Sequence, residues 1–523
     1  MTKIMSLDDA VSLIRDGDTI WINAFLAISN PIDLTSALSR RVAAGNGPQN
    51  LTVYCSAGFG DWAEDSECEG FVRDGAVSRV VIGHYTSMPS TARKIMANEI
   101  EGYNLPLGVM SHMVRAAASR KTKLYSKVGL NLFVDPRYNQ YGLNERSTAE
   151  LVRRVTVEGE ELLSYDVPKI DVALIKGSSA DMRGNISFED EAASLDALSA
   201  AQAARNNGGK VIVQVSRVTD RQQRPRNVII PGMLVDAIVV CENQSQIVHV
   251  MGKNMSLSGD VYAHGKELEV WYELLQRNMI TNAKGREPIH NVIGNRAFLE
   301  LKEGQVANIG VGIPEVVGLV AVKRDYLSKI CLTVESGATG GLPANGVAFG
   351  ATIGAEMIVD MAQQFDFYDG GGLDICFIGA LEIDKYGNVN GHDAKGKLSG
   401  IGGLANITQN SKNVVFCCTF SAKGLETEVV GEEIHIKQEG SVPKFVERVK
   451  SISFSAENAR RNGQNILYVT ERCVFDLGEK GLRLVEVADG IDLRRDILDR
   501  LPFEVEQAET LGKMPVCGEL PAG

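Results

Sequence analysis

A motif that occurs twice places the strongest constraint on how this chain can fold. In each copy an apolar, strand-like run is followed by an Asp-x-x-Gly-Asn turn and a further apolar residue. The first copy spans Asp171–Ile186 and the second Asp374–Val389, 203 residues later at every matched position. An apolar strand followed by the same turn, twice in one chain, predicts two related domains in tandem. Chance similarity between unrelated α/β segments is the alternative.

An earlier pair of segments supports this repeat. Ile14–Asn23 and Leu301–Gly310 share an order in which an acidic residue and a glycine precede an apolar run. The separation here is larger, 287 residues from Gly17 to Gly304. We therefore expect the first half to contain extra residues between its two matching segments.

Helix-like and strand-like segments alternate along the chain. Ala192–Asn207 predicts a helix, Gly208-Gly209 its end, and Lys210–Val215 a strand; the same order recurs in Asn295–Lys302 and Val306–Val311. This alternation is typical of α/β folds with mainly parallel sheets.

The length of 523 residues exceeds what a single core usually sustains. We predict two tandem related open α/β domains with mainly parallel sheets and the active site between them. The N-terminal domain is expected over residues 1–280 and the C-terminal domain over 290–523. The polar stretch Arg277–Ile293 is expected to join them, and Met514–Gly523 to be a loose tail.

Charge and cysteine usage exclude several classes of function. The 54 Lys and Arg against 66 Asp and Glu give a net charge of −12, which disfavours nucleic acid and anionic membranes as partners. Apolar runs fall short of the ~18 residues that span a bilayer, and the N-terminus lacks a signal-peptide pattern, so we expect a cytoplasmic protein. The nine cysteines are scattered without a CxxC pair, which favours reduced thiols and no metal site.

Glu335 is the strongest candidate for a chemical role. The apolar run Ile330–Val334 ends abruptly in Glu335-Ser336-Gly337, and the glycine-rich loop Ala338–Gly346 follows. Ligands of parallel α/β sheets gather at the carboxyl ends of strands, and glycines allow a substrate to approach the backbone closely. A surface glutamate in a turn is the alternative on position alone.

Two glycine loops favour the functional interpretation. Asn308–Pro314, with Gly310-Val311-Gly312, closes a strand, and Ser399–Leu404 contains Gly400, Gly402 and Gly403. Exposed backbone N–H groups near a helix start suit an anionic ligand or an oxyanion. Neither loop is a Walker motif, and a nucleotide-binding fold is only weakly indicated. His84 and Arg115 are interpreted as structural residues in apolar surroundings.

An ordered set of segments over nearly the whole chain resembles the class I coenzyme A transferases, in particular the single-chain acetate or propionate CoA-transferase group. The segments are Gly83-His84, Phe133–Arg137, Phe188–Glu191, Gly310–Gly312, Thr333–Gly337, Gln364–Tyr368, Gly370–Asp374, Gly400–Gly403 and Tyr468–Arg472.

The resemblance implies a role for each motif. Glu335 matches the nucleophile, which carries CoA as a glutamyl-CoA thioester in ping-pong transfer between a short-chain acyl-CoA and a short-chain carboxylate such as acetate, propionate, lactate or butyrate. Gly400, Gly402 and Gly403 match a loop with oxyanion-hole N–H groups, and Gly310, Val311 and Gly312 match a CoA contact. The implied partners are acyl-CoA and small carboxylic acids. The resemblance also implies that coenzyme A is a substrate, that no cofactor is permanently bound, and that the protein is a homo-oligomer, a tetramer or a dimer.

The chain also departs from this family. Relatives commonly have small or hydroxyl residues where this chain has Asn131 and Leu132, and glycines in the loop that contains Phe25. Phe25, Asn131 and Leu132 are candidates for an acyl pocket, and if they line it, the choice of substrate can differ from plain acetate or propionate. Two other functions remain open at this point: an acyl-CoA thioesterase that uses Glu335 to activate water, and a binding protein or sugar-phosphate sensor on a similar fold.

Overall fold

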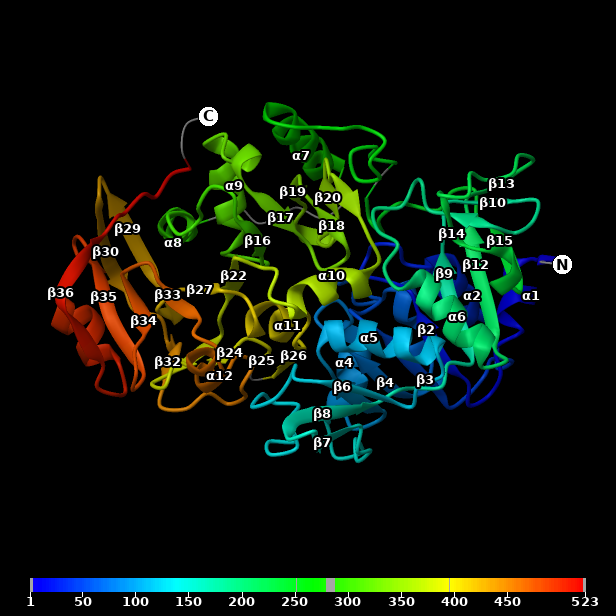
Figure 1. Ribbon diagram of the computed structural model, residues 1–523, viewed down its shortest axis with the longest axis horizontal. Helices are drawn as coiled ribbons and strands as arrows, with labels where there is room; N and C mark the ends of the chain where they lie inside the picture. Colours follow the sequence, from blue (N-terminus) through cyan, green and yellow to red (C-terminus); the bar gives the residue numbers. More distant parts are fainter. Residues whose placement is uncertain (1–2, 251, 279–286, 395, 521–523) are drawn as a thin grey trace.

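A computed structural model describes residues 3–250, 252–278, 287–394 and 396–520 of the chain. The first half of the sequence (blue to green) lies on the right of Figure 1 and the end of the second half (yellow to red) on the left. Three helices pack against one another where the halves meet: α5 (Leu107–Ala118), α10 (Met361–Asp369) and α11 (Leu404–Gln409).

The first half is built on an eight-stranded sheet in which every neighbouring pair is parallel. Its strands, in spatial order, are β1 (Lys3–Ile4), β15 (Ala237–Val240), β12 (Lys210–Val215), β9 (Val172–Lys176), β2 (Thr19–Ile22), β3 (Leu51–Cys55), β4 (Val77–Ile82) and β5 (Glu101–Asn104). Besides α5, its helices are α1 (Leu7–Val11), α2 (Ile32–Ala43), α3 (Gly70–Arg73), α4 (Pro89–Met96) and α6 (Ala197–Asn206). The strands are mostly apolar because helices cover a parallel sheet.

The second half is built on a ten-stranded sheet with a parallel centre. The pairs on either side of this centre are antiparallel, except that the outermost pair at one edge is parallel. Its strands, in spatial order, are β21 (Met357–Ile358), β18 (Ala338–Thr339), β17 (Cys331–Thr333), β16 (Val306–Ile309), β22 (Ile375–Gly379), β27 (Asn413–Cys417), β33 (Asn465–Val469), β34 (Cys473–Leu477), β35 (Leu482–Ala488) and β36 (Glu506–Met514). Besides α10 and α11, its helices include α8 (Pro288–Phe298), α9 (Glu315–Lys323) and α12 (Ala456–Arg461).

Smaller sheets flank these two. They contain β6 (Lys123–Ser126), β8 (Glu160–Asp166) and β7 (Val152–Val157); β13 (Arg217–Thr219), β10 (Ser179–Asp181), β11 (Ile186–Ser187) and β14 (Val228–Ile230); β24 (Val389–Asn390), β23 (Glu382–Asp384) and β32 (Phe445–Val446); β19 (Leu342–Pro343) and β20 (Thr352–Ile353); β25 (Asp393–Ala394) and β26 (Lys397–Leu398); β28 (Ser421–Ala422) and β31 (Val442–Pro443); and β29 (Glu426–Val430) and β30 (Glu433–Gln438).

The repeated turn has the same hydrogen bonds in both halves. One carboxylate oxygen of Asp181 accepts from the backbone N–H groups two and four residues later, at 2.9 and 3.0 Å. Asp384 does the same at 3.0 and 2.9 Å. Gly184 and Gly387 have φ of 78° and 90°, a left-handed conformation that favours glycine. This shared geometry confirms the prediction of two related α/β halves.

The sheets match in register as well. The N–H of Thr19 donates to Asp171 at 3.0 Å in the first half, and the N–H of Val306 donates to Asp374 at 2.9 Å in the second. Strand β2 lies between β9 and β3, as β16 lies between β22 and β17. The register pairs Trp21 with Tyr54 and Asn308 with Thr333. Two residues after these partners, Ser56 in the first half takes the place of Glu335 in the second.

Some predicted boundaries were wrong. Helix α6 begins at Ala197 because Leu195, with φ of 57°, is left-handed and cannot continue a helix. Helix α8 begins earlier than predicted, at Pro288, so the end of the expected linker is helical. The C-terminal segment, which was expected to be a loose tail from Met514, is hydrogen-bonded to the second half as far as residue 519. The side-chain amide of Asn295 donates to the carbonyls of Cys517 and Glu519 at 3.2 and 3.0 Å.

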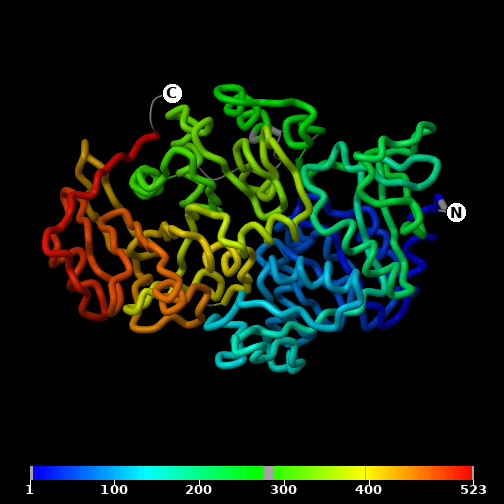
Figure 2. The backbone as a smooth tube through the Cα atoms, in the orientation of Figure 1, coloured from blue at the N-terminus to red at the C-terminus, as the bar shows by residue number. Residues whose placement is uncertain are grey.

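The segment after β15 crosses to the second half, along the top of Figure 2. It ends in α7 (Lys266–Asn278), which packs against β20 and α9. Residues 279–286, on which the expected join largely falls, lie outside the described residues. The division into 1–280 and 290–523 therefore stays a prediction.

The interior is continuous between the halves. One cluster of buried apolar side chains includes Leu107 of the first half and Phe365 and Leu404 of the second. The nine cysteines are free thiols, and six of them are buried. In the described part of the chain, no helix is long and apolar enough to cross a bilayer, and no group of three or more His, Cys, Asp or Glu side chains could hold a metal ion.

Candidate active site

Glu335 lies just after β17, at the carboxyl end of the strand, and only 7% of its surface is exposed. The chain turns sharply after it. Gly337 has φ of 115°, and a Cβ atom there would lie 2.0 Å from the carbonyl oxygen of Val359. The hydroxyl of Ser336 donates to the carbonyl of Gly350. The glycine is thus required for the turn that ends the strand and holds Glu335 in place.

The side chain of Glu335 reaches a cavity of about 630 Å³ that both halves of the chain line. The first half contributes residues that follow β2, β3 and β4, and the second half contributes Glu335 and residues of its glycine loops. Most of the lining side chains are apolar, among them Phe25, Leu26, Leu107 and Phe349. A largely apolar cavity with a few polar groups is typical of a small-molecule site.

The carboxyl group of Glu335 has an unusual electrostatic environment. Burial raises its pKa above the usual glutamate range, while hydrogen bonding from its own backbone amide and from the Asn308 side chain opposes the rise. In the described part of the chain, no Lys, Arg or His forms an ion pair with it. A carboxylate that is neither paired nor well solvated is suited to attack an electrophile.

Residues beneath Glu335 fix the strand that carries it. The Asn308 amide donates to the carbonyl of Thr333 at 3.1 Å, and the Thr333 hydroxyl donates to the carbonyl of Ala307 at 3.1 Å. The Tyr368 hydroxyl donates to Thr333 Oγ1 at 2.9 Å. These bonds join β16, β17 and α10 below the site.

The second glycine loop lies directly against the nucleophile candidate. A Cβ atom on Gly403 would lie 2.9 Å from Cγ and 3.0 Å from Oε1 of Glu335. The Gly402 N–H already donates to the carbonyl of Gly83 at 2.8 Å, so it is not free to bind an oxyanion in this structure. Among the described residues none accepts from the Gly403 N–H, which leaves it available.

Gly400 has a packing role. It has φ of 82°, and a Cβ there would lie 2.6 Å from the carbonyl oxygen of Gly83. Glycine at this position therefore allows the loop to pack against the first half of the chain.

The first glycine loop likewise contains N–H groups that already have an acceptor and one that has none. The Gly310 N–H donates to the carbonyl of Phe377 at 2.8 Å, and the Gly312 N–H donates to Glu315 at 3.0 Å. Val311 lines the cavity, and no described residue accepts from its N–H. Of the six residues expected to bind an oxyanion or CoA, Val311 and Gly403 therefore combine a place at the cavity with an unengaged amide.

Backbone hydrogen bonds join the halves at this loop. The Tyr85 N–H donates to the carbonyl of Ser399 at 2.7 Å, and the Leu107 N–H donates to the carbonyl of Gly402 at 3.0 Å. The Asn104 side chain accepts from the Ile401 N–H at 2.9 Å. We refer to these bonds, with the one from Gly402 to Gly83, as the interlock.

The three residues expected at an acyl pocket are not brought together. Phe25 lines the cavity and packs on Phe349, with ring centroids 5.9 Å apart. Asn131 lies elsewhere, its amide donating to Asn458 at 2.7 Å, and Leu132 lines a different, small cavity beside the same asparagine. These two residues join the segment after β6 to α12 and do not reach Glu335.

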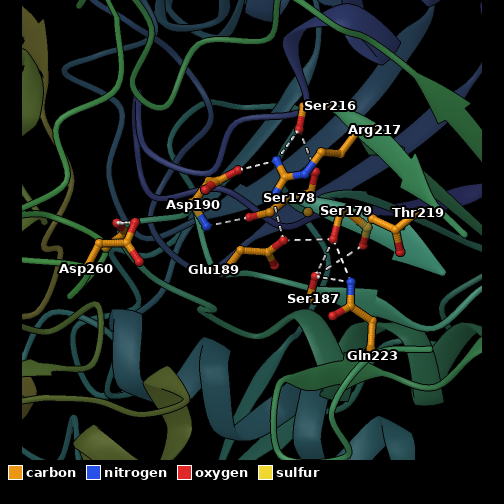
Figure 3. Close-up of polar contacts among 12 residues, drawn as sticks. Ser178, Ser179, Ser187, Glu189, Asp190, Ser216, Arg217, Thr219, Gln223 and Asp260 are labelled. Carbon is orange, nitrogen blue, oxygen red and sulfur yellow. Dashed lines mark hydrogen bonds and ion pairs between the residues drawn. The ribbon is translucent and has the colours of Figure 1, made fainter. Parts of the chain in front are cut away.

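The acidic motif after Phe188 belongs to a separate polar network, shown in Figure 3. The Arg217 guanidinium donates to Glu189 at 2.7 Å and to Asp190 at 2.6 Å, and the Ser179 hydroxyl donates to Glu189 at 2.8 Å. These contacts hold β10 and β13 to the following loop. The motif is structural here and does not line the cavity of Glu335.

Several cavity residues were missed by the sequence analysis. His84 lines the cavity, although its setting was interpreted as structural. Asp61 and His249 line it too, with 2.9 Å between a carboxylate oxygen and Nε2. Trp62 and His249 have φ of 67° and 65°, a strain that clusters at functional sites. In the sequence, the resemblance of Gly83-His84 to the family was the one signal for this side of the cavity.

Comparison with known proteins identifies the family of this chain. The family model described as Coenzyme A transferase matches residues 4–241 and 292–430. Acetate CoA-transferase YdiF of Escherichia coli K12 is 37% identical over 502 residues, 96% of this chain and 92% of that protein. Caffeate CoA-transferase of Acetobacterium woodii is 35% identical over 517 residues, 96% of this chain and 94% of that protein.

A solved structure gives the same result for the fold. The acyl-CoA transferase YdiF apoenzyme from E. coli O157:H7 superposes with a TM-score of 0.89 at 35% identity, covering 98% of this chain and 95% of that one. Repeat, sheets and cavity are thus found in a chain similar to a CoA transferase over almost its full length. The chain belongs to the coenzyme A transferase family, in the group of single-chain acetate CoA-transferases.

Proposed function

We propose that this CoA transferase works by a ping-pong mechanism in which Glu335 is the nucleophile and carries CoA as a glutamyl thioester. The observation that carries the proposal is the buried, unpaired carboxylate at the end of β17, which faces a cavity beside the available N–H of Gly403. The comparisons support transfer of CoA between an acyl-CoA and a carboxylate.

The proposed reaction divides the exchange into balanced steps. The Glu335 carboxylate attacks the thioester carbonyl of the acyl-CoA and expels CoA thiolate, which leaves an acyl-glutamyl anhydride. The thiolate then attacks the glutamyl carbonyl, releases the first acid as its carboxylate and forms glutamyl-CoA. A second carboxylate attacks the glutamyl carbonyl and expels CoA thiolate, which leaves a new acyl-glutamyl anhydride. The thiolate then attacks the acyl carbonyl of this anhydride, which forms the new acyl-CoA and releases the Glu335 carboxylate. Coenzyme A enters and leaves as a substrate.

Each attack creates an oxyanion that backbone amides can stabilise. Val311 and Gly403 have unengaged N–H groups at the cavity, and loss of one such donor typically costs about 3–4 kcal/mol of transition-state stabilisation. The cavity between the halves also limits access of water to the thioester. A thioesterase is not favoured, because the relatives with high similarity are transferases.

The acyl range belongs to the proposal. We assign short-chain acids such as acetate, propionate, lactate or butyrate as donors and acceptors, and a homo-oligomer, dimer or tetramer, as the working form. The names of the relatives include both acetate and caffeate, so the choice of acid is to be measured on this chain.

Mass spectrometry tests the mechanism directly. The protein is mixed with an acyl-CoA and no acceptor, digested, and searched for a CoA adduct on the peptide that contains Glu335. We expect the adduct on wild type, and neither adduct nor transfer in a folded Glu335→Ala variant. Transfer by that variant at near wild-type rates would refute the assignment of the nucleophile.

A further inference from the structure

His84 is held rigidly at the point where the two halves touch. It follows β4, and its N–H donates to the carbonyl of Ala57 at 2.6 Å. A Cβ on Gly58 would lie 2.5 Å from the His84 carbonyl oxygen, and one on Gly400 would lie 3.0 Å from its Cα. The backbone thus fits between two glycines, one from each half of the chain.

The His84 ring lines the same cavity as Glu335. Its Cδ2 atom lies 3.8 Å from the position that a Cβ on Gly402 would take, whereas Glu335 contacts the corresponding position of Gly403. The imidazole and the carboxylate therefore adjoin consecutive residues of one glycine loop, at the wall of one cavity.

The ring of His84 has no hydrogen-bond partner among the described residues, and its Nδ1 is buried. Other buried or partly buried histidines differ. His392 Nδ1 lies 2.6 Å from the Ser453 hydroxyl, His112 Nε2 lies 3.2 Å from the carbonyl of Ala362, and His249 Nε2 lies 2.9 Å from Asp61. Nδ1 is a buried nitrogen without a partner, whereas Nε2 is not among the buried atoms that lack one, so Nε2 is the ring nitrogen that remains accessible from the cavity that His84 lines.

The protonation state of His84 allows it to act as an uncharged hydrogen-bond donor. Burial lowers its pKa to about 4, so the imidazole is neutral at pH 7. A neutral imidazole donates from one nitrogen only, and the Nε2–H tautomer directs that donor to the cavity while Nδ1 remains an acceptor. Enzymes elsewhere use a neutral histidine to polarise a substrate carbonyl.

We propose that His84 is a catalytic residue whose Nε2–H donates a hydrogen bond to the carbonyl oxygen under attack, as that oxygen becomes an oxyanion. The proton stays on Nε2 throughout, so the imidazole stabilises charge and transfers none. This donor replaces the Gly402 N–H, which the interlock already engages. The inference rests on the proposed glutamyl-CoA route.

The test compares rates of glutamyl-CoA formation in a single turnover, by rapid quench and mass spectrometry. His84→Phe keeps a ring of similar size and removes the donor, and we expect the rate to fall about 10²–10³-fold with an unchanged end point. His84→Gln restores an N–H and is expected to remain within about tenfold of wild type. The KM for acyl-CoA is expected to change far less than kcat, because the bond strengthens in the transition state.

His392→Phe is the matched control. His392 is buried and its pKa is likewise lowered to about 4 by burial, yet it does not line the cavity. We expect a wild-type rate from it, and His84→Met serves as a second donor-free variant if His84→Phe does not fold. Wild-type rates in either donor-free variant, an equal loss in His84→Gln, or an equal loss in His392→Phe would each overturn the proposal. Absence of any adduct in wild type would instead refute the glutamyl route, and the same comparison of overall transfer rates would then decide the role of His84.

Discussion

Gly403→Ala is a one-atom test of the geometry at the nucleophile. The new Cβ would lie 2.9 Å from Cγ and 3.0 Å from Oε1 of Glu335. Carbon atoms pack at about 3.5–4.0 Å, so the glutamate side chain must move by roughly 0.6–1 Å. The alanine keeps the backbone N–H, and the substitution therefore separates position from oxyanion binding.

The size of the effect follows from this displacement. A misplacement of about 1 Å at a reacting group can cost about 100-fold in rate, equivalent to about 2.7 kcal/mol of activation free energy. The fold should tolerate the change, because Gly403 has φ of −81° and ψ of −9°, a conformation open to alanine. We expect the free energy of unfolding to change by less than about 1 kcal/mol.

The assay is steady-state transfer of CoA from an acyl-CoA to a carboxylate, with thermal unfolding measured on the same samples. Gly318→Ala in α9 is the matched control, because its Cβ would meet nothing closer than 3.4 Å. We expect the control to transfer CoA at the wild-type rate. A Gly403→Ala enzyme with full activity would show that the carboxylate is not confined as described.

Three further predictions concern stability. Because burial raises the pKa of Glu335, the folded state binds its proton up to a higher pH, and stability falls as pH rises through that window. Thermal melts should therefore show Glu335→Gln stabilising the protein at pH 7 and having little effect below the usual glutamate range. Asp384→Ala should lower the free energy of unfolding, measured in urea, by about 3 kcal/mol or more, because the turn N–H groups lose their buried acceptor. Asp384→Asn should lower it by less. Lys176→Met should lower the free energy of unfolding by about 3–5 kcal/mol, because it leaves the buried carboxylate of Glu191, now 2.8 Å from the Lys176 ammonium, without a partner. Replacing both Lys176 and Glu191 by methionine should recover much of this loss in the same assay.

The repeat could be predicted from sequence because its cause is local. An apolar run, an aspartate and a left-handed glycine at fixed spacing form the same turn wherever they occur, and both copies do so at Asp181 and Asp384. The position of Glu335 at a strand end followed from the same kind of pattern. Helix starts were less predictable, since Leu195 adopts a left-handed conformation that its identity does not indicate.

The finer parts of the site depend on contacts between distant segments. Which glycine amides are free was not predictable, because the partner of Gly402 is Gly83, more than 300 residues away. Asn131 was expected near the acyl group, but its amide is bound to Asn458. His84 was assigned a structural role because nothing local to it shows that the two halves enclose a cavity there.

The interlock has a consequence for how this enzyme could be divided. Were the two halves made as separate polypeptides, the bonds from Tyr85 to Ser399 and from Gly402 to Gly83 would become contacts between subunits. Each partner alone would hold an incomplete site, one with the glutamate and the other with the imidazole. Activity would then rise with the concentration of both pieces and report their association, as complementation between fragments does.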